Sequence, residues 1–177
     1  MKKIFAFCAV ALVAGAMFTS CNKNKVADNA MTVTLGEEQW VATEVYVDVT
    51  LDEATKDGND NLMVLAGSNG DYMDANTTYV QGFTGKENGT YTKANGYVIG
   101  YFEGEDDVDA DGFGNWQATA ATQELTNVDL NAKTIEGTIN QTMKNAKKEL
   151  TDVAMTINLT NVAWTVHDMA KNGKLAK

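Results

Sequence analysis

Alternation between apolar and polar residues is the main pattern in this chain, and it is strongest over residues 40–51. A period of two over a dozen positions, with many β-branched residues, indicates a β-strand. One face of this strand is apolar and the other is mixed, as expected where an antiparallel sheet covers a core on one side. The apolar face would consist of Val41, Thr43, Val45, Val47, Val49 and Leu51.

Turn residues separate further short β-rich runs. Asx-Gly pairs, which tolerate the positive φ angles of hairpin turns, occur at residues 57–58, 69–70, 88–89, 95–96 and 111–112. Strands are predicted at residues 62–66, 77–83, 89–93, 97–103, 116–122, 125–130, 134–141, 153–159 and 162–167. The pattern therefore predicts an all-β domain of about 8–10 strands, either an antiparallel β-sandwich or an up-and-down, lipocalin-like barrel.

Four local features add detail to this fold. The apolar run 62–66 should be buried on both faces. Asn95-Gly96 should link the strands on either side as a two-residue hairpin, and residues 131–133 should form another turn. Residues 142–150 fit a short helix and a solvated loop equally well.

The first 20 residues have the layout of a secretory signal peptide. Lys2 and Lys3 precede the apolar run 4–17, which is too short to span a hydrocarbon core that takes about 20 residues. Phe18-Thr19-Ser20-Cys21 follows, and it resembles the lipobox of bacterial lipoproteins, with Phe18 in place of the usual leucine. The resemblance implies cleavage before Cys21 and a diacylglycerol on its sulfur. The alternative is a plain signal peptide that is cleaved near Ser20 and leaves a soluble protein.

These patterns divide the chain into a signal peptide (1–20), a lipidated Cys21 with a flexible tether (21–34) and a single β domain (35–177). The lipobox resemblance implies a protein attached to the outer membrane through its lipid, with the periplasmic and surface-facing sides both left open. Two or three acyl chains anchor a protein firmly, because each buried CH₂ contributes about 0.8 kcal/mol.

The charge of the chain narrows its range of partners. The sequence has 14 basic residues, all lysine, and 24 acidic residues, for a formal net charge of −10. The leader carries two of the lysines and no acid, so the cleaved chain has a charge of −12. Nucleic acids are excluded as partners because phosphate contacts need clustered lysine or arginine.

With Cys8 in the leader and Cys21 acylated, the domain also lacks a thiol for a disulfide, a nucleophile or a zinc site.

From residue 62 onward the layout resembles small uncharacterised lipoproteins that have a lipocalin-like or calycin-like β domain. The shared features are an early apolar strand, Gly89-Thr90-Tyr91, Gly137-Thr138-Ile139 and a closing strand. This resemblance implies a β-barrel and brings no catalytic residues with it.

An acidic loop is the candidate metal site. Asp107, Asp109 and Asp111, followed by Gly112, place a carboxylate at every second position before a sharp turn, and Ca²⁺ takes 6–8 oxygen ligands. The twelfth position of an EF-hand loop counted from Asp107 is Ala118 instead of glutamate, so other ligands would have to come from elsewhere. The alternative is a solvated acidic hairpin loop without a cation.

Aromatic residues form the candidate ligand-binding site. Tyr97 and Tyr101 share one face of a predicted strand, and Trp116 begins another strand. Facing outward, these three rings would form a stacking platform for sugars; facing inward, they would line the core or a barrel cavity.

Catalytic patterns are weak in this sequence. His167 is the only histidine, Ser68 is the only serine after the leader, and no spacing marks a pair of carboxylates. We therefore expect a non-enzymatic, lipid-anchored envelope protein whose β domain binds a partner, protein or glycan, or serves structurally. The alternative is a lipocalin-like protein that binds a small ligand or carbohydrate, with a Ca²⁺-stabilised loop; no other cofactor is expected.

Overall fold

A computed structural model describes residues 29–48, 61–70, 76–104 and 115–166 and shows a nearly all-β fold. The strands are β1 (Ala30–Leu35), β2 (Glu38–Val41), β3 (Glu44–Asp48), β4 (Leu62–Ser68), β5 (Thr78–Gly85), β6 (Gly89–Thr92), β7 (Ile99–Glu103), β8 (Trp116–Asp129), β9 (Thr134–Asn145), β10 (Leu150–Ala163) and β11 (Thr165–Val166), with a 3-10 helix η2 (Lys93–Asn95). Within these residues, no helix has the length and apolar character that a membrane crossing requires.

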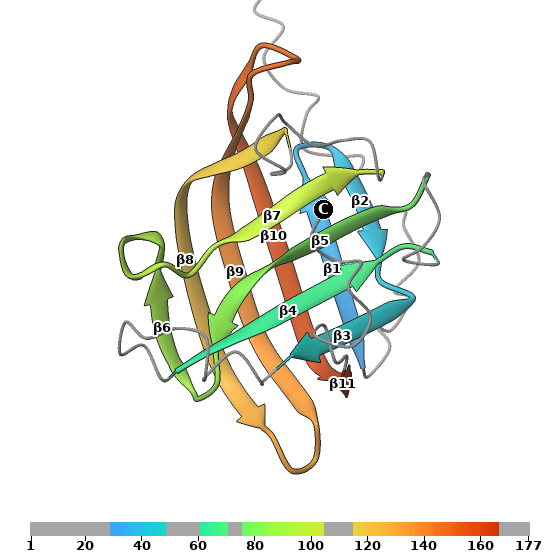
Figure 1. The fold of residues 1–177 in the computed structure, drawn as a ribbon, viewed down its shortest axis with the longest axis vertical. Helices are drawn as coiled ribbons and strands as arrows, with labels where there is room; N and C mark the ends of the chain where they lie inside the picture. The colour runs from blue at the N-terminus through green and yellow to red at the C-terminus, as the bar shows by residue number, and fades with distance from the viewer. Residues whose placement is uncertain (1–28, 49–60, 71–75, 105–114, 167–177) are drawn as a thin grey trace, which may run out of the picture.

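The described strands form one eleven-stranded, mostly antiparallel sheet that curls into a half-barrel (Figure 1). The strand order is β11-β3-β4-β5-β7-β8-β9-β10-β1-β2, and β6 pairs with β8. β11 follows β10 after a single residue, Trp164, and pairs in parallel with β3. The chain itself therefore connects the β10 part of the sheet to the β3 part. The all-β fold class predicted from the sequence is confirmed.

The core lies between the oblique strands β4, β5 and β7 and the steeper strands β8, β9, β10 and β1, which pass behind them in Figure 1. Alternate side chains along the long strands point inward, so each strand supplies residues at a period of two. One cluster of buried residues unites Met31 of β1, Leu65 of β4, Ile99 of β7, Ile139 of β9 and Ile157 of β10. β4 is buried along its whole length, as predicted for a strand covered on both faces.

The predicted tether is too long at its C-terminal end, because residues 30–34 belong to β1. β1 lies inside the sheet, between β10 and β2, and Met31 and Val33 are buried in the core. Thr32 and Thr34 alternate with them on the outside. The period of two was present in the sequence, but the polar residues on both sides of this short strand masked it.

The strand predicted at 40–51 is two strands. β2 ends at Val41 and β3 begins at Glu44; between them Ala42 N donates a hydrogen bond to Met31 O and Thr43 N donates to Ser68 O, both at 2.8 Å. The chain thus leaves β1 and joins β4. Val41 is 53 % exposed and Val47 is fully buried, so the single apolar face was wrong. Alternation of apolar and polar residues cannot show such a break, because a segment alternates in the same way whether it pairs with β1 or with β4. Residues 49–51 lie outside the described part of the chain.

Two predictions about turns have different outcomes. Residues 131–133 do join β8 to β9, and Asp129 Oδ1 accepts hydrogen bonds from the backbone N of Asn131 (2.9 Å) and Ala132 (2.8 Å). Asn95-Gly96 also forms a turn, with Gly96 at a φ of +89°. However, β6 pairs with β8 whereas β7 pairs with β5 and β8, so the predicted hairpin between β6 and β7 was wrong.

Residues 142–150 contain no helix. β9 continues to Asn145, an exposed turn occupies residues 146–149, and β10 begins at Leu150. Only the four turn residues match the solvated-loop alternative. The inward positions Gln141, Met143 and Asn145 are buried and continue the period of two, so the helical spacing in this stretch was coincidental.

Two buried glutamines bind backbone groups of β7 and β5 beyond the single residue pair that joins β7 to β8. β7 pairs with β8 at Tyr101 and Trp116, and farther along β7 the side chain of Gln141 takes over. Ile99 N donates to Gln141 Oε1 (2.8 Å), and Gln141 Nε2 donates to Ile99 O (2.6 Å). In the same way, Gln123 Nε2 donates to Phe83 O at 2.8 Å. The glutamines thereby satisfy backbone groups that a strand would otherwise bind.

Candidate functional site

The three predicted aromatic site residues face inward. Tyr97, Tyr101 and Trp116 are only 4 %, 2 % and 4 % exposed. The Tyr101 and Trp116 rings meet edge to face, with centroids 6.2 Å apart, and both belong to the core cluster. Of the two expected orientations, the structure shows the inward one and not the exposed stacking platform. Ligand binding by these residues stays a prediction.

Tyr97 precedes β7 and packs against Tyr91, with ring centroids 4.6 Å apart. Burial raises the pKa of the Tyr97 hydroxyl above 10.0, and the electrostatic influence of Tyr91 raises it further. Loss of the proton would place a negative charge where water cannot solvate it fully. Tyr97 is therefore a packed, neutral side chain at ordinary pH.

Several predicted residues lie outside the described part of the chain. They are Cys21, Asp107, Asp109, Asp111 and His167. Among the residues that the structure does describe, no three histidine, cysteine or acidic side chains are grouped as a metal site would require. The lipid site and the calcium loop stay predictions.

A surface that the sequence reasoning did not single out covers the outside of six neighbouring strands. Residues that pair directly across strands have side chains on the same face of the sheet, so the strand register defines two rows. The first polar row runs across β6, β8, β9, β10, β1 and β2 through Thr92, Thr122, Asn140, Thr156, Thr34 and Gln39. The second polar row crosses the same strands through Thr90, Glu124, Thr138, Asn158, Thr32 and Val41.

These two rows, together called the polar face, are chemically uniform. Ten of the twelve side chains are threonine, asparagine or glutamine; the exceptions are Glu124 and Val41. All twelve are exposed or half-buried. The polar face is therefore a broad surface of hydroxyl and amide groups with a single formal charge in its rows.

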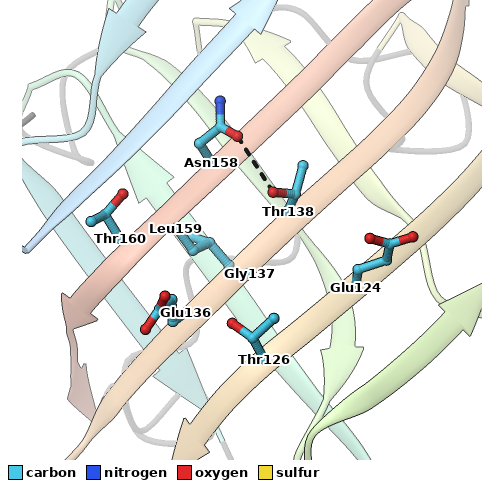
Figure 2. A pocket seen from close by; sticks show the side chains of 8 residues that line it. All are labelled: Glu124, Thr126, Glu136, Gly137, Thr138, Asn158, Leu159 and Thr160. Atoms are coloured by element: carbon cyan, nitrogen blue, oxygen red, sulfur yellow. Dashed lines mark hydrogen bonds between the residues drawn. The ribbon is translucent and has the colours of Figure 1, made fainter.

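Hydrogen bonds between neighbouring strands orient the amides of the polar face. Thr156 Oγ1 donates to Asn140 Oδ1 (3.1 Å), and Thr138 Oγ1 donates to Asn158 Oδ1 (3.5 Å). The two bonds run in opposite directions between β9 and β10. Each asparagine uses its oxygen within the sheet, so its Nδ2 is available as a donor to another molecule. Figure 2 shows this nitrogen of Asn158 pointing away from Thr138.

A depression of about 300 Å³ continues the second polar row over β8, β9 and β10 (Figure 2). Its lining comprises Glu124, Thr126, Glu136, Gly137, Thr138, Asn158, Leu159 and Thr160. The ladders are irregular here, with register shifts between Leu125 and Asn127 in β8 and between Leu159 and Val162 in β10. Gly137 has a φ of +156°, and a Cβ at this position would collide with the carbonyl oxygen of Glu124. Glycine is thus required where β8 and β9 approach each other beneath the depression.

The depression offers hydrogen-bonding groups of both kinds. Threonine hydroxyls donate and accept, the Asn158 amide donates, and the carboxylates of Glu124 and Glu136 accept. Both glutamates are exposed, and in Figure 2 they lie on either side of Thr126. None of the eight lining residues carries a positive charge. Such a surface is suited to an uncharged ligand that is rich in hydroxyl groups.

A signal for the polar face was present in the sequence. Threonine or asparagine occupies every second position through Thr138, Asn140 and Thr142, and again through Thr156 and Asn158. Alternation identifies the buried half of each strand, but it does not reveal that the outer halves of different strands share the same chemistry. Only strand register shows that these positions align into rows.

Comparison of this chain with protein-family models, with curated proteins and with solved structures finds no match.

Proposed function

We propose that this protein is held in the bacterial cell envelope by a lipid on Cys21 and that its β domain is a non-enzymatic binding module that uses the polar face. The observation that carries the proposal is the order of segments. The chain has, in this order, a lysine pair, an apolar run that is too short to span a hydrocarbon core, and Cys21. The first strand of the domain begins nine residues after that cysteine, at Ala30. A short link of this kind keeps the domain close to the membrane.

The chemistry of the polar face supports binding over catalysis. Hydrolysis of a glycoside needs one carboxylic acid whose pKa is raised, commonly by burial, and a second carboxylate opposite it. Glu124 and Glu136 are both exposed on an open surface, so neither of them has the burial that such an acid requires. A face made of hydroxyls and amides can hold a ligand by hydrogen bonds without activating any of its bonds.

Fatty-acid labelling of growing cells tests the anchor. Cells expressing the full-length protein are fed an alkyne-tagged fatty acid, and the purified protein is examined for the tag. We expect labelling of the wild-type protein and none of Cys21→Ser. Cys8→Ser is the matched control and should be labelled like the wild type, because residue 8 would leave with the signal peptide. Equal labelling of Cys21→Ser, or none of the wild type, would overturn the proposal.

A further inference from the structure

We propose that the polar face binds a neutral glycan chain, with one sugar seated in the depression over β8, β9 and β10. The inference rests on the proposed function only in assigning a binding role to this domain, and it adds the site and the chemical class of the ligand. Hydroxyl groups of a sugar both donate and accept hydrogen bonds, and so do the threonine, asparagine and glutamine side chains of the two polar rows.

The charge of the polar face argues against an anionic ligand. Glu124 is the only charged residue in the two rows, and Glu136 adds a second carboxylate at the depression. The chain as a whole has a net charge of −10. An anionic polymer would be repelled and would find no cationic side chain among the residues of the rows or the depression. A carboxylate is a strong acceptor for the hydroxyl groups of an uncharged sugar.

The composition of the polar face argues against a protein as its occupant. The centres of protein interfaces are enriched in aromatic residues, methionine and arginine. None of these types occurs among the twelve residues of the polar rows, in which Val41 is the single apolar side chain. A folded protein partner would remove water from many hydroxyl and amide groups and leave them without hydrogen bonds, which costs free energy. The hydroxyl groups of a glycan would instead form hydrogen bonds with them.

The geometry of the polar face fits an extended chain. Neighbouring strands lie about 4.8 Å apart, a spacing comparable to the length of one hexose ring in an extended glycan. A chain that follows a row would therefore meet a fresh hydroxyl or amide at each strand. The Thr156–Asn140 and Thr138–Asn158 hydrogen bonds hold the amides in place before binding, so less conformational entropy is lost on binding.

The depression gives one sugar of the bound chain a defined position on the polar face. Its volume of about 300 Å³ accommodates a single hexose, whereas the rest of the face is open. Glu124, Thr138 and Asn158 belong both to the depression and to the second polar row. A sugar in the depression would thus be continuous with a chain that follows the row across β10, β1 and β2.

Affinity electrophoresis with defined neutral polymers tests the proposal. The full-length lipidated protein, purified in a detergent that contains no sugar, is run in native gels cast with dextran, galactomannan or xyloglucan, and in gels with anionic polygalacturonate. We expect at least one neutral polymer to retard the protein and polygalacturonate to leave it unretarded. No retardation by any of the three neutral polymers, or retardation by polygalacturonate alone, would overturn the proposal.

Matched variants locate the site. Thr138→Val combined with Asn158→Ala removes one oriented hydroxyl–amide pair of the depression and should weaken retardation roughly tenfold or more. Thr165→Val combined with Asn131→Ala makes the same chemical changes outside the polar face and should leave retardation unchanged. Equal binding by both double variants, each folded by circular dichroism, would place the site elsewhere and contradict the inference.

Two further readouts separate this inference from the proposed function. If a neutral polymer retards the protein while Cys21 carries no lipid, the proposed anchor is wrong and the proposed glycan site is supported. If Cys21 is acylated and no neutral polymer binds, the glycan site is wrong and the anchor stands. New reducing ends in the polymer after incubation would show hydrolysis and contradict the non-enzymatic role, while leaving binding by the polar face intact.

Discussion

The side-chain amide of Gln141 forms both hydrogen bonds with the backbone of Ile99, accepting from its N at 2.8 Å and donating to its O at 2.6 Å. Gln141 projects inward from β9, and its cross-strand partner on β8 is the small residue Ala121. The side chain can therefore extend past β8 to β7. The glutamine side chain thus makes the two backbone hydrogen bonds that a neighbouring strand would otherwise make.

Replacement of Gln141 by leucine should destabilise the domain strongly. The substitution introduces an apolar side chain of similar size and leaves the N–H and C=O of Ile99 without the partners that the Gln141 amide provides. Each unsatisfied buried group costs about 1–3 kcal/mol, so we expect a loss of roughly 2–6 kcal/mol in the free energy of unfolding. Urea denaturation followed by tryptophan fluorescence measures it.

Gln123→Leu is the matched control. Gln123 donates one hydrogen bond to Phe83 O, and its Oε1 is buried with no hydrogen-bond partner among the described residues. Leucine removes the bond and the unpaired oxygen together, so the two effects oppose each other. We expect less than half the loss seen for Gln141→Leu. Equal losses in the two variants would refute the assigned role of Gln141.

β1 supplies core residues to the domain although it was expected to be a tether. Met31 is 1 % exposed, and replacement of a buried methionine by alanine costs about 2–5 kcal/mol. Met31→Ala should therefore lower the urea midpoint clearly. Thr32→Ala, on the outer side of the same strand, should change it little. A midpoint unaffected by Met31→Ala would mean that residues 30–34 are a tether after all.

Gly82 of β5 lies against the backbone of Val98 and Ile99 with no room for a side chain. A Cβ on Gly82 would collide with the backbone of Val98 and Ile99, and backbone atoms cannot move aside as a flexible side chain can. We expect Gly82→Ala to cost about 1–3 kcal/mol or more, as overpacking does in cores. Gly89→Ala, whose added Cβ would lie 3.4 Å from its nearest neighbour, is the control and should be nearly neutral in thermal unfolding.

Tyr97 should make the domain less stable in strongly alkaline solution. Its pKa in the folded state is raised above the ordinary value of 10.0, so the folded protein keeps this proton at pH values where the unfolded chain has lost it. Between those two pKa values the unfolded state binds fewer protons, and the free energy of unfolding falls as pH rises. Tyr97→Phe should reduce this fall between pH 9 and 11, measured by urea denaturation. Unchanged pH dependence in Tyr97→Phe would contradict the assignment.

Alternation along the chain was sufficient to predict the fold class, because a strand with one buried face must alternate. The continuous apolar run 62–66 predicted β4, whose residues are buried on both faces, and turn-forming residues predicted the turn at residues 131–133. Alternation could not place the break between Val41 and Glu44, because a strand that changes partner keeps the same alternation. It also could not reveal that β6 pairs with β8, because pairing between distant segments depends on how the whole sheet curls.

The candidate site escaped prediction for a related reason. Thr138 and Asn158 are 20 residues apart in sequence and adjacent in space, and only the register of β9 and β10 brings them together. The buried orientation of Tyr101 and Trp116 followed from the same geometry. An aromatic residue on a strand fits either face of a sheet equally well, so its neighbours in the folded sheet decide its role.

Mass spectrometry of the N-terminal peptide of the protein, extracted from membranes, tests the central claim most directly. The account predicts a chain that begins at Cys21 and carries the mass of a diacylglycerol on the cysteine sulfur. A mature chain that begins elsewhere, or an unmodified thiol at position 21, would contradict it.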